Sequence, residues 1–236
     1  MRRFWERAEP ERVAGGWRVL LDGRPVRLPG GGAPLLLVPF RLADAVAAEW
    51  QQAGGRQGGA MSYADVPLTR IAGTAQERIA PSPESMVLQL ARFGGADLLC
   101  YRAERPEPLV RRQQERWQPW LDWAAETYGA RLAVTTGVMH VTQEPRALAA
   151  LAQAVAVYCP SALAALGVAV PALGSLVLGL ALAAGRLTAG EAHDLACLDE
   201  LFQAGQWGED DEAHARRRRI GEEVAVAGRF LELVGS

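Results

Sequence analysis

Few residues in this sequence have types and spacing that could do chemistry, and the best placed pair is His193 and Cys197. Their spacing of four residues would place both side chains on one face of a helix, where an imidazole can take a proton from a thiol. Helical packing also produces this spacing by chance, and nothing else in the sequence supports a catalytic dyad. A thiol enzyme therefore stays open as the less favoured alternative, and we expect no catalytic residues.

The other residue types that bind metals or phosphate are scattered. The histidines are His140, His193 and His214, and the cysteines are Cys100, Cys159 and Cys197. Neither set shows a ligand spacing such as HExxH or CxxC, and a phosphate-binding loop of the GxxxxGK kind needs a lysine, which this chain lacks. We therefore expect no metal site and no cofactor, and we expect the cysteines to be buried thiols of a reducing compartment.

Acidic residues cluster in "WGEDDEA", residues 207 to 213. Carboxylates can ligate a divalent cation, but the twelve-position pattern of a calcium loop is absent here. The cluster stands in or near the first turn of a predicted last helix, and Arg216 to Arg219 follow later in that helix. Acidic groups at the start of a helix and basic groups further along it both interact favourably with the helix dipole. The plain interpretation of the cluster is therefore a solvent-exposed helix terminus.

Composition and charge narrow the function classes further. Of the 236 residues, 50% are hydrophobic, which suffices for a substantial core without disulfides or metals. The net charge of −2, with interspersed signs, lacks the basic stripe of a nucleic-acid-binding protein. The chain opens with "MRRFWERAEP", which has no apolar segment of the kind found in signal peptides. We therefore expect a protein of the bacterial cytoplasm that does not bind nucleic acid.

A long uncharged stretch from Ala147 to Gly185 raises the question of a membrane span. Crossing a bilayer takes about 20 mostly apolar residues. Pro171 is expected to divide the stretch, and the longer piece, 172–185, would extend only about 21 Å as a helix, against roughly 30 Å of hydrocarbon. Its leucines recur at helical spacing, so the sequence favours a buried helical core over membrane insertion. A membrane-attached protein remains the less favoured interpretation.

The elements that would position these residues change in character near residue 80. Before it, an Asp-Gly pair at 22–23 separates two alternating apolar segments, which predicts a β-hairpin, and "PLLLVP" predicts a further strand near a sheet edge. Leu42, Val46 and Trp50 repeat at helical spacing and should place one face of a helix on that sheet. We therefore predict an α+β fold that begins with a small α/β domain, residues 1–80, made of a hairpin-containing sheet plus a helix.

Residues 81–236 are predicted to form a larger, all-helical C-terminal domain. A Ser-Pro pair at 82–83 has the residue types of a helix start. "TAGE", residues 188–191, fits a capping box, and its helix is expected to end close to Gly205. Pro119 should kink or divide the helix in which it lies. We expect the two domains to pack together, because no low-complexity linker separates them.

Six stretches, in order along the chain, resemble a known family. They are "DGRPVRLP", "LADAVAAEWQQ", "VPLTRIAGTA", "DLLCYRAERPEPLVRRQQERWQPWLDWA", "GSLVLGLALAAGRL" and "LDELFQAGQWGEDDEA". Together they cover most of the chain, and six pieces in order with similar spacing make the resemblance specific. The family is that of the assembly chaperones for the alpha subunit of the F-type ATP synthase, found in mitochondria and in alphaproteobacteria. Gly73 and Ala96 depart from it, since members often carry Asn and Thr at these positions.

The resemblance implies a molecular chaperone for ATP synthase assembly and not an enzyme. Such a protein holds the free alpha subunit, whose nucleotide-site interface is apolar and exposed, until the alpha subunit pairs with the beta subunit. The resemblance also implies two domains, a small α/β part and a larger helical part, in agreement with a boundary near residue 80. The segment that matches "GSLVLGLALAAG" belongs to the helical part in this family.

The motif "LDELFQAGQWGEDDEA" is the most characteristic C-terminal part of that resemblance. The partner-binding residues that it implies are Glu200, Gln203, Trp207, Gly208, Glu209 and Asp211. Carboxylates here could pair with basic residues of the alpha subunit or imitate acidic groups of the beta subunit. For Trp207, packing at the helix end is an equally supported alternative. A helical scaffold or binding protein unrelated to ATP synthase remains the main alternative function.

Overall fold

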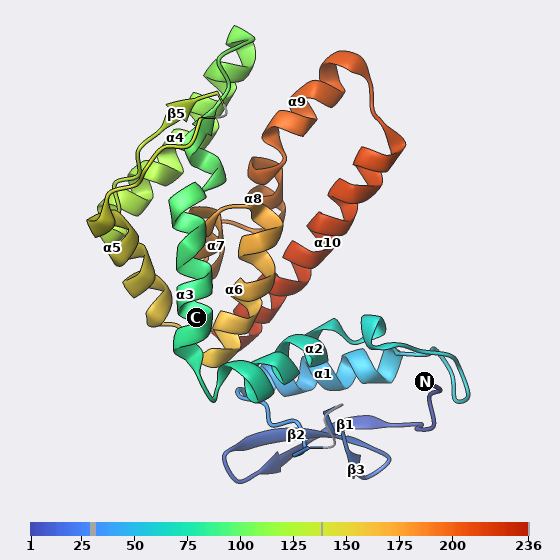
Figure 1. The fold of residues 1–236 in the computed structure, drawn as a ribbon. Coiled ribbons are helices and arrows are strands. Elements are labelled where there is room, and N and C mark those ends of the chain that lie inside the picture. The colour runs from blue at the N-terminus through green and yellow to red at the C-terminus, as the bar shows by residue number, and fades with distance from the viewer. Residues whose placement is uncertain (29–31, 138, 236) are drawn as a thin grey trace.

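The structure, a computed structural model, describes residues 1–28, 32–137 and 139–235. A three-stranded sheet lies at one end of the molecule, α1 and α2 cover it, and the other helices stand on their far side (Figure 1). The strands are β1 (Ala8–Val13), β2 (Gly16–Leu21), β3 (Arg24–Pro25), β4 (Tyr101–Arg102) and β5 (Thr135–Thr136). The helices are α1 (Phe40–Gln52), α2 (Pro67–Thr74), α3 (Pro83–Ala91), α4 (Glu107–Tyr128), α5 (Pro145–Ala156), α6 (Pro160–Leu173), α7 (Leu176–Ala183), α8 (Ala189–Ala196), α9 (Leu198–Trp207) and α10 (Asp211–Val234).

The predicted hairpin is confirmed, and it belongs to an antiparallel sheet with strand order β1-β2-β3. Asp22 and Gly23 connect β2 to β3 with positive φ angles of 47° and 79°, which Asp and Gly tolerate best. The sequence does not predict β1, because "AEPERV" lacks an alternating apolar pattern. Residues 34–38 join the sheet edge through isolated bridges, such as Trp17 with Leu37, and not as the continuous strand that "PLLLVP" predicts. Pro39, directly after this segment, lacks the N–H that would continue the alternating bonds made by Leu35 and Leu37.

Helix α1 lies with one face on this sheet, as predicted. Leu42, Val46 and Trp50 are all buried on that face. The indole N–H of Trp50 donates to Thr69 Oγ1 at 2.8 Å, and the indole N–H of Trp5 donates to the carbonyl of Trp50 at 3.1 Å. The two indole rings also meet edge to face. Trp50 therefore joins the N-terminal segment, α1 and α2 in one packed unit.

The uncharged stretch 147–185 forms most of α5 and all of α6 and α7. Most of it lies in α6 and α7, and every residue of α7 is buried. The prediction that Pro171 divides the stretch is wrong, because Pro171 lies inside α6 and the break comes after Leu173. Gly174 has a φ of 64°, the left-handed geometry that ends helices, and the hydroxyl of Ser175 then caps α7. Among the residues that the structure describes, no helix combines the length and apolar character needed to cross a membrane.

Other helix limits also differ from the prediction. Helix α4 continues through Pro119, which therefore does not divide it. The capping box at 188–191 is confirmed, but the helix that it starts, α8, ends at Ala196. A second helix, α9, follows and ends at Trp207, so Gly205 does lie close to a helix end, but to that of α9. At Cys197 the backbone has φ −95° and ψ 11°, outside the helical range, which separates α8 from α9.

The predicted α+β class is confirmed. The sheet and its covering helices make up the N-terminal part, and the regular elements in the rest of the described residues are helices and the two-residue parallel pair of β4 and β5. Helix α1 contacts α10, α2 contacts both α6 and α10, and buried residues of the two parts form one hydrophobic cluster. The division into domains 1–80 and 81–236 stays a prediction, and the shared core indicates that each part stabilises the other.

Candidate functional site

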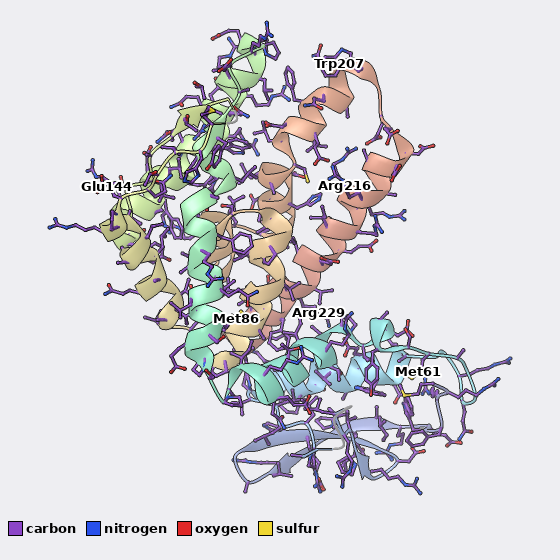
Figure 2. The ribbon with its side chains drawn as sticks, viewed as in Figure 1. Met61, Met86, Glu144, Trp207, Arg216 and Arg229 are labelled. Carbon is purple, nitrogen blue, oxygen red and sulfur yellow. The ribbon has the colours of Figure 1, made fainter. Side chains whose placement is uncertain are left out.

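The predicted partner-binding residues lie on one helical hairpin, formed by α9 and α10 and projecting away from the sheet (Figure 1). The chain turns between these helices at Gly208, whose φ of 91° favours glycine. Asp210 then caps α10, because its carboxylate accepts a hydrogen bond from the N–H of Ala213 at 2.8 Å. Trp207 is the last residue of α9 and lies at the tip of the hairpin (Figure 2).

Arg217 joins the two helices of this hairpin. Its side chain is 7% exposed, and its guanidinium nitrogens lie 2.6 Å from a carboxylate oxygen of Glu209 and 3.7 Å from one of Glu200. Arg216 adds an ion pair of 2.7 Å to Glu200, and His214 contacts Glu209 at 2.9 Å. Two of the predicted carboxylates are therefore engaged inside the hairpin, where they fix the loop that follows Trp207.

The remaining predicted side chains face solvent. Trp207 is 79% exposed, so packing at the helix end is not observed for it. Gln203 and Asp211 are also exposed, and Asp211 stands in the first turn of α10. An exposed indole among acidic groups suits a partner surface that is apolar and basic. Across the described ranges, this tip included, no group of three or more His, Cys, Asp or Glu side chains is placed to hold a metal ion.

Residues outside the predicted set hold α9 in place. The side-chain amide of Gln113 donates to Asp199 Oδ1 at 2.7 Å, and its oxygen accepts from the N–H of Ala103 at 2.8 Å. Arg102 donates to the backbone carbonyl of Gln113 at 2.7 Å and stacks on the ring of Trp117. The sequence carries no signal for this network, because a polar residue on an amphipathic helix is expected to face solvent.

His193 and Cys197 do lie together, with Nε2 and Sγ 3.4 Å apart. The same Nε2 lies 2.9 Å from the backbone carbonyl of Arg217, which can only accept, so this nitrogen carries a proton and is not a base for the thiol. Burial raises the pKa of Cys197 to about 11, which keeps the thiol protonated at neutral pH. The pair therefore acts in packing, where it ties α8 to α10.

Thiol labelling tests this assignment. Cys100 and Cys197 are buried, and burial raises their pKa values to about 12 and about 11, whereas Cys159 is exposed, so the expectation of three buried thiols is wrong for Cys159. We expect a single fast-reacting thiol in the native protein at neutral pH, and none after Cys159→Ser. Mass spectrometry counts the labelled sites. Fast labelling of Cys197 under these conditions would contradict the packing role and restore the thiol-enzyme alternative.

Acid is expected to loosen the turn between α9 and α10. The hydrogen bond with His214 and the nearby Arg217 hold the pKa of Glu209 below its ordinary value of 4.5. The ion pairs of Glu209 therefore stabilise the turn above pH 4.5 and are lost as the pH falls through the lowered pKa. Amide hydrogen exchange at 208–210 should accelerate over that range, relative to its intrinsic rate. Glu209→Gln should exchange faster already at neutral pH, and a wild type with no acid transition there would contradict the assignment.

Comparisons with known proteins agree with one another. Residues 2–125 match the family of the ATP12 chaperone protein. Among solved structures, Atp12 from Paracoccus denitrificans is 43% identical with a TM-score of 0.91, and the match covers 99% of this chain and 98% of that one. A variant of the Paracoccus protein with one aspartate changed to lysine matches equally well, over 99% and 97% of the two chains. Atu1473 from Agrobacterium tumefaciens, a candidate chaperone, is 41% identical with a TM-score of 0.89, over 98% and 85%. This chain belongs to the ATP12 chaperone family.

Proposed function

We propose that this chaperone takes part in ATP synthase assembly by binding the free alpha subunit of the F-type enzyme until the beta subunit replaces it. The observation that carries the proposal is Trp207, which is 79% exposed at the tip of the α9–α10 hairpin. A side chain of this size gains free energy when a partner surface covers it. The residues proposed to contact the alpha subunit are Glu200, Gln203, Trp207, Gly208, Glu209 and Asp211.

The proposed task is recognition without reaction. The alpha-subunit interface is apolar and is buried only in the assembled ring, so the chaperone must cover it and still be displaced by the true partner. In this scheme Glu200 and Glu209 hold the hairpin in shape through Arg217. Trp207 supplies apolar contact, and Asp211 is placed to attract a basic residue of the alpha subunit.

A pull-down tests the proposal. Tagged chaperone, expressed in cells of its own source, should recover alpha subunit without the beta-containing ring, and recovery should be highest for freshly synthesised material. Mass spectrometry identifies the recovered chains. Recovery of the complete enzyme, or of no alpha subunit under conditions that capture other partners, would overturn the proposal. It would favour the alternative of a scaffold protein unrelated to ATP synthase.

We propose that the chaperone works in the bacterial cytoplasm. We also propose that its chain is divided into domains 1–80 and 81–236 and that it catalyses no reaction. Fractionation of cells checks the location, because a membrane-attached protein would resist extraction by salt and carbonate. Recovery in the fraction that stays with the membrane would contradict the cytoplasmic assignment.

A further inference from the structure

An extended segment, residues 34–38, forms one edge of the N-terminal sheet region. The N–H groups of Leu35 and Leu37 donate to carbonyl oxygens of the sheet region, at 3.0 and 2.8 Å. Successive residues of an extended chain direct their backbone groups to opposite sides. The carbonyl of Pro34 and the N–H of Leu36 therefore point away from the sheet.

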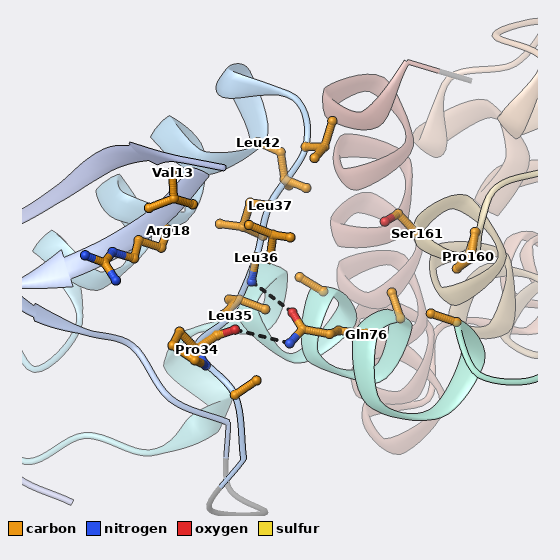
Figure 3. A pocket seen from close by; sticks show the side chains of 15 residues that line it. Val13, Arg18, Pro34, Leu35, Leu36, Leu37, Leu42, Gln76, Pro160 and Ser161 are labelled. Atoms are coloured by element: carbon orange, nitrogen blue, oxygen red, sulfur yellow. Dashed lines mark hydrogen bonds between the residues drawn. The ribbon is translucent and has the colours of Figure 1, made fainter. Parts of the chain in front are cut away.

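The side chain of Gln76 occupies this outer edge (Figure 3). Its Oε1 accepts from the N–H of Leu36 at 2.9 Å, and its Nε2 donates to the carbonyl of Pro34 at 3.1 Å. An added strand would make the same kinds of bond to these two groups, so the amide side chain stands in for a peptide backbone. Gln76 also belongs to a π-helical turn, Ala75–Ile79, a geometry that occurs frequently at functional positions.

A groove of about 570 Å³ runs beside this edge, a volume typical of binding sites. Leu36 lines one wall, Ala80 belongs to the segment after α2, and Pro160 at the start of α6 lines the opposite wall (Figure 3). Leu36 and Val38 are 45% and 57% exposed, so a ligand that covers them would bury apolar surface. The groove thus offers backbone hydrogen-bonding groups along one wall and apolar side chains around them.

We propose that this groove binds an extended, apolar segment of the client polypeptide, which adds as a strand along residues 34–38 and displaces Gln76. The inference rests on the proposed function in naming the alpha subunit as the source of that segment. Backbone bonds supply affinity that depends little on sequence, and an apolar side chain that enters the groove supplies selectivity. The groove would hold a segment that becomes buried when the alpha subunit enters the ring.

Peptide binding to the full-length chain tests strand addition directly. The probes are overlapping peptides that cover the alpha subunit, and the readout is the backbone amide signal of Leu36 in the isotope-labelled protein. We expect apolar peptides to shift this signal. Methylating the peptide nitrogen that pairs with Pro34 should weaken binding about tenfold, because the donor is lost, whereas methylating a neighbouring nitrogen that faces outward should not. Binding that tolerates methylation at every position would indicate an apolar ligand without strand pairing and would overturn the inference.

Gln76→Met gives a second, opposite prediction. Methionine has nearly the same shape as glutamine but makes neither of the two bonds, so a peptide no longer has to displace them. Peptide affinity should therefore increase about tenfold, while thermal unfolding of the free protein stays within a few degrees. Unchanged or weaker peptide binding by Gln76→Met would contradict displacement of this side chain.

A variant that fills the groove tests whether the groove is needed for capture of the client. Ala80 is exposed and lines the groove, so Ala80→Trp should fill it, and Ala225→Trp makes the same change on the exposed face of α10. Ala80→Trp should abolish the Leu36 shift and weaken capture of the purified alpha subunit about tenfold, and Ala225→Trp should do neither. Normal capture by Ala80→Trp would overturn the inference and leave the proposed function standing. Failure of the wild type to capture alpha subunit would overturn the proposed function. If the protein dimerises and only Ala80→Trp abolishes the dimer, the groove binds a second copy of this chain and not the client, which would overturn the inference.

Discussion

Trp50→Arg is expected to remove most of the stability of the fold. Trp50 is 4% exposed, and its indole N–H donates to Thr69 Oγ1 at 2.8 Å. Truncating a buried aromatic side chain costs about 3–5 kcal/mol, and a buried cation without a partner costs more. Because the whole free energy of unfolding of a typical protein is about 5–15 kcal/mol, this variant should be largely unfolded or insoluble. Circular dichroism during urea unfolding, with the yield of dissolved protein, measures the effect.

Two other variants separate the causes. Trp50→Phe keeps an aromatic ring but loses the N–H bond to Thr69, and should lower the free energy of unfolding by about 1–2 kcal/mol. Trp207→Arg makes the same exchange as Trp50→Arg, but at a side chain that is 79% exposed. It should change the free energy of unfolding by less than about 0.5 kcal/mol. If Trp50→Arg proves as stable as Trp207→Arg, α1 is not packed against Trp5 and Thr69 as described.

The elements that the sequence predicts correctly are those with short-range signals. The turn at 22–23 depends on two residues that tolerate positive φ, and the buried face of α1 depends on a regular spacing of Leu42, Val46 and Trp50. Strand β1 has no such signal, because its polar residues are held by pairing with β2, a contact that only the folded chain makes. A local pattern therefore locates the hairpin but not the full sheet.

Proline is a weaker breaker in this fold than its local rule predicts. Trp117 and Leu121 are buried on either side of Pro119, so ending α4 there would expose one of them. Val170 and Leu173 bracket Pro171 in the same way within α6. Burial of the flanking side chains offsets the backbone bond that each proline removes. Packing, which the sequence does not display, thus sets where these helices end.

The candidate site can be predicted from the sequence only in part. Trp207 and the acidic residues stand out by type, but Arg217 lies in a run of four arginines, 216–219, that look alike in sequence. An α-helix turns about 100° per residue, so the four point in different directions, and Arg216 and Arg217 both reach Glu200 on α9. The direction depends on how α9 and α10 pack, and it selects Arg217 as the buried partner of Glu200 and Glu209.

Trp207→Ala is expected to weaken binding of the purified alpha subunit about thirtyfold without unfolding the chaperone. An exposed tryptophan that becomes buried at the centre of an interface typically contributes about 2 kcal/mol or more to binding, whereas its removal from the free protein costs little. Calorimetric titration gives the affinity, and urea unfolding gives the stability. Leu88→Ala is the matched control, because Leu88 is 63% exposed on α3, outside the hairpin, and should leave both quantities unchanged.

Asp211→Lys tests the charge at the same tip and is a cleaner change than Glu209→Lys. Glu209 contacts both Arg217 and His214, so reversing its charge also disturbs the hairpin, whereas Asp211 is exposed in the first turn of α10. Asp211→Lys should cost about 0.5 kcal/mol of helix stability but slow association with the alpha subunit at low salt, and added salt should reduce the difference. If Asp211→Lys and Trp207→Ala both bind like the wild type, the α9–α10 hairpin is a structural feature and the client binds elsewhere on the chain.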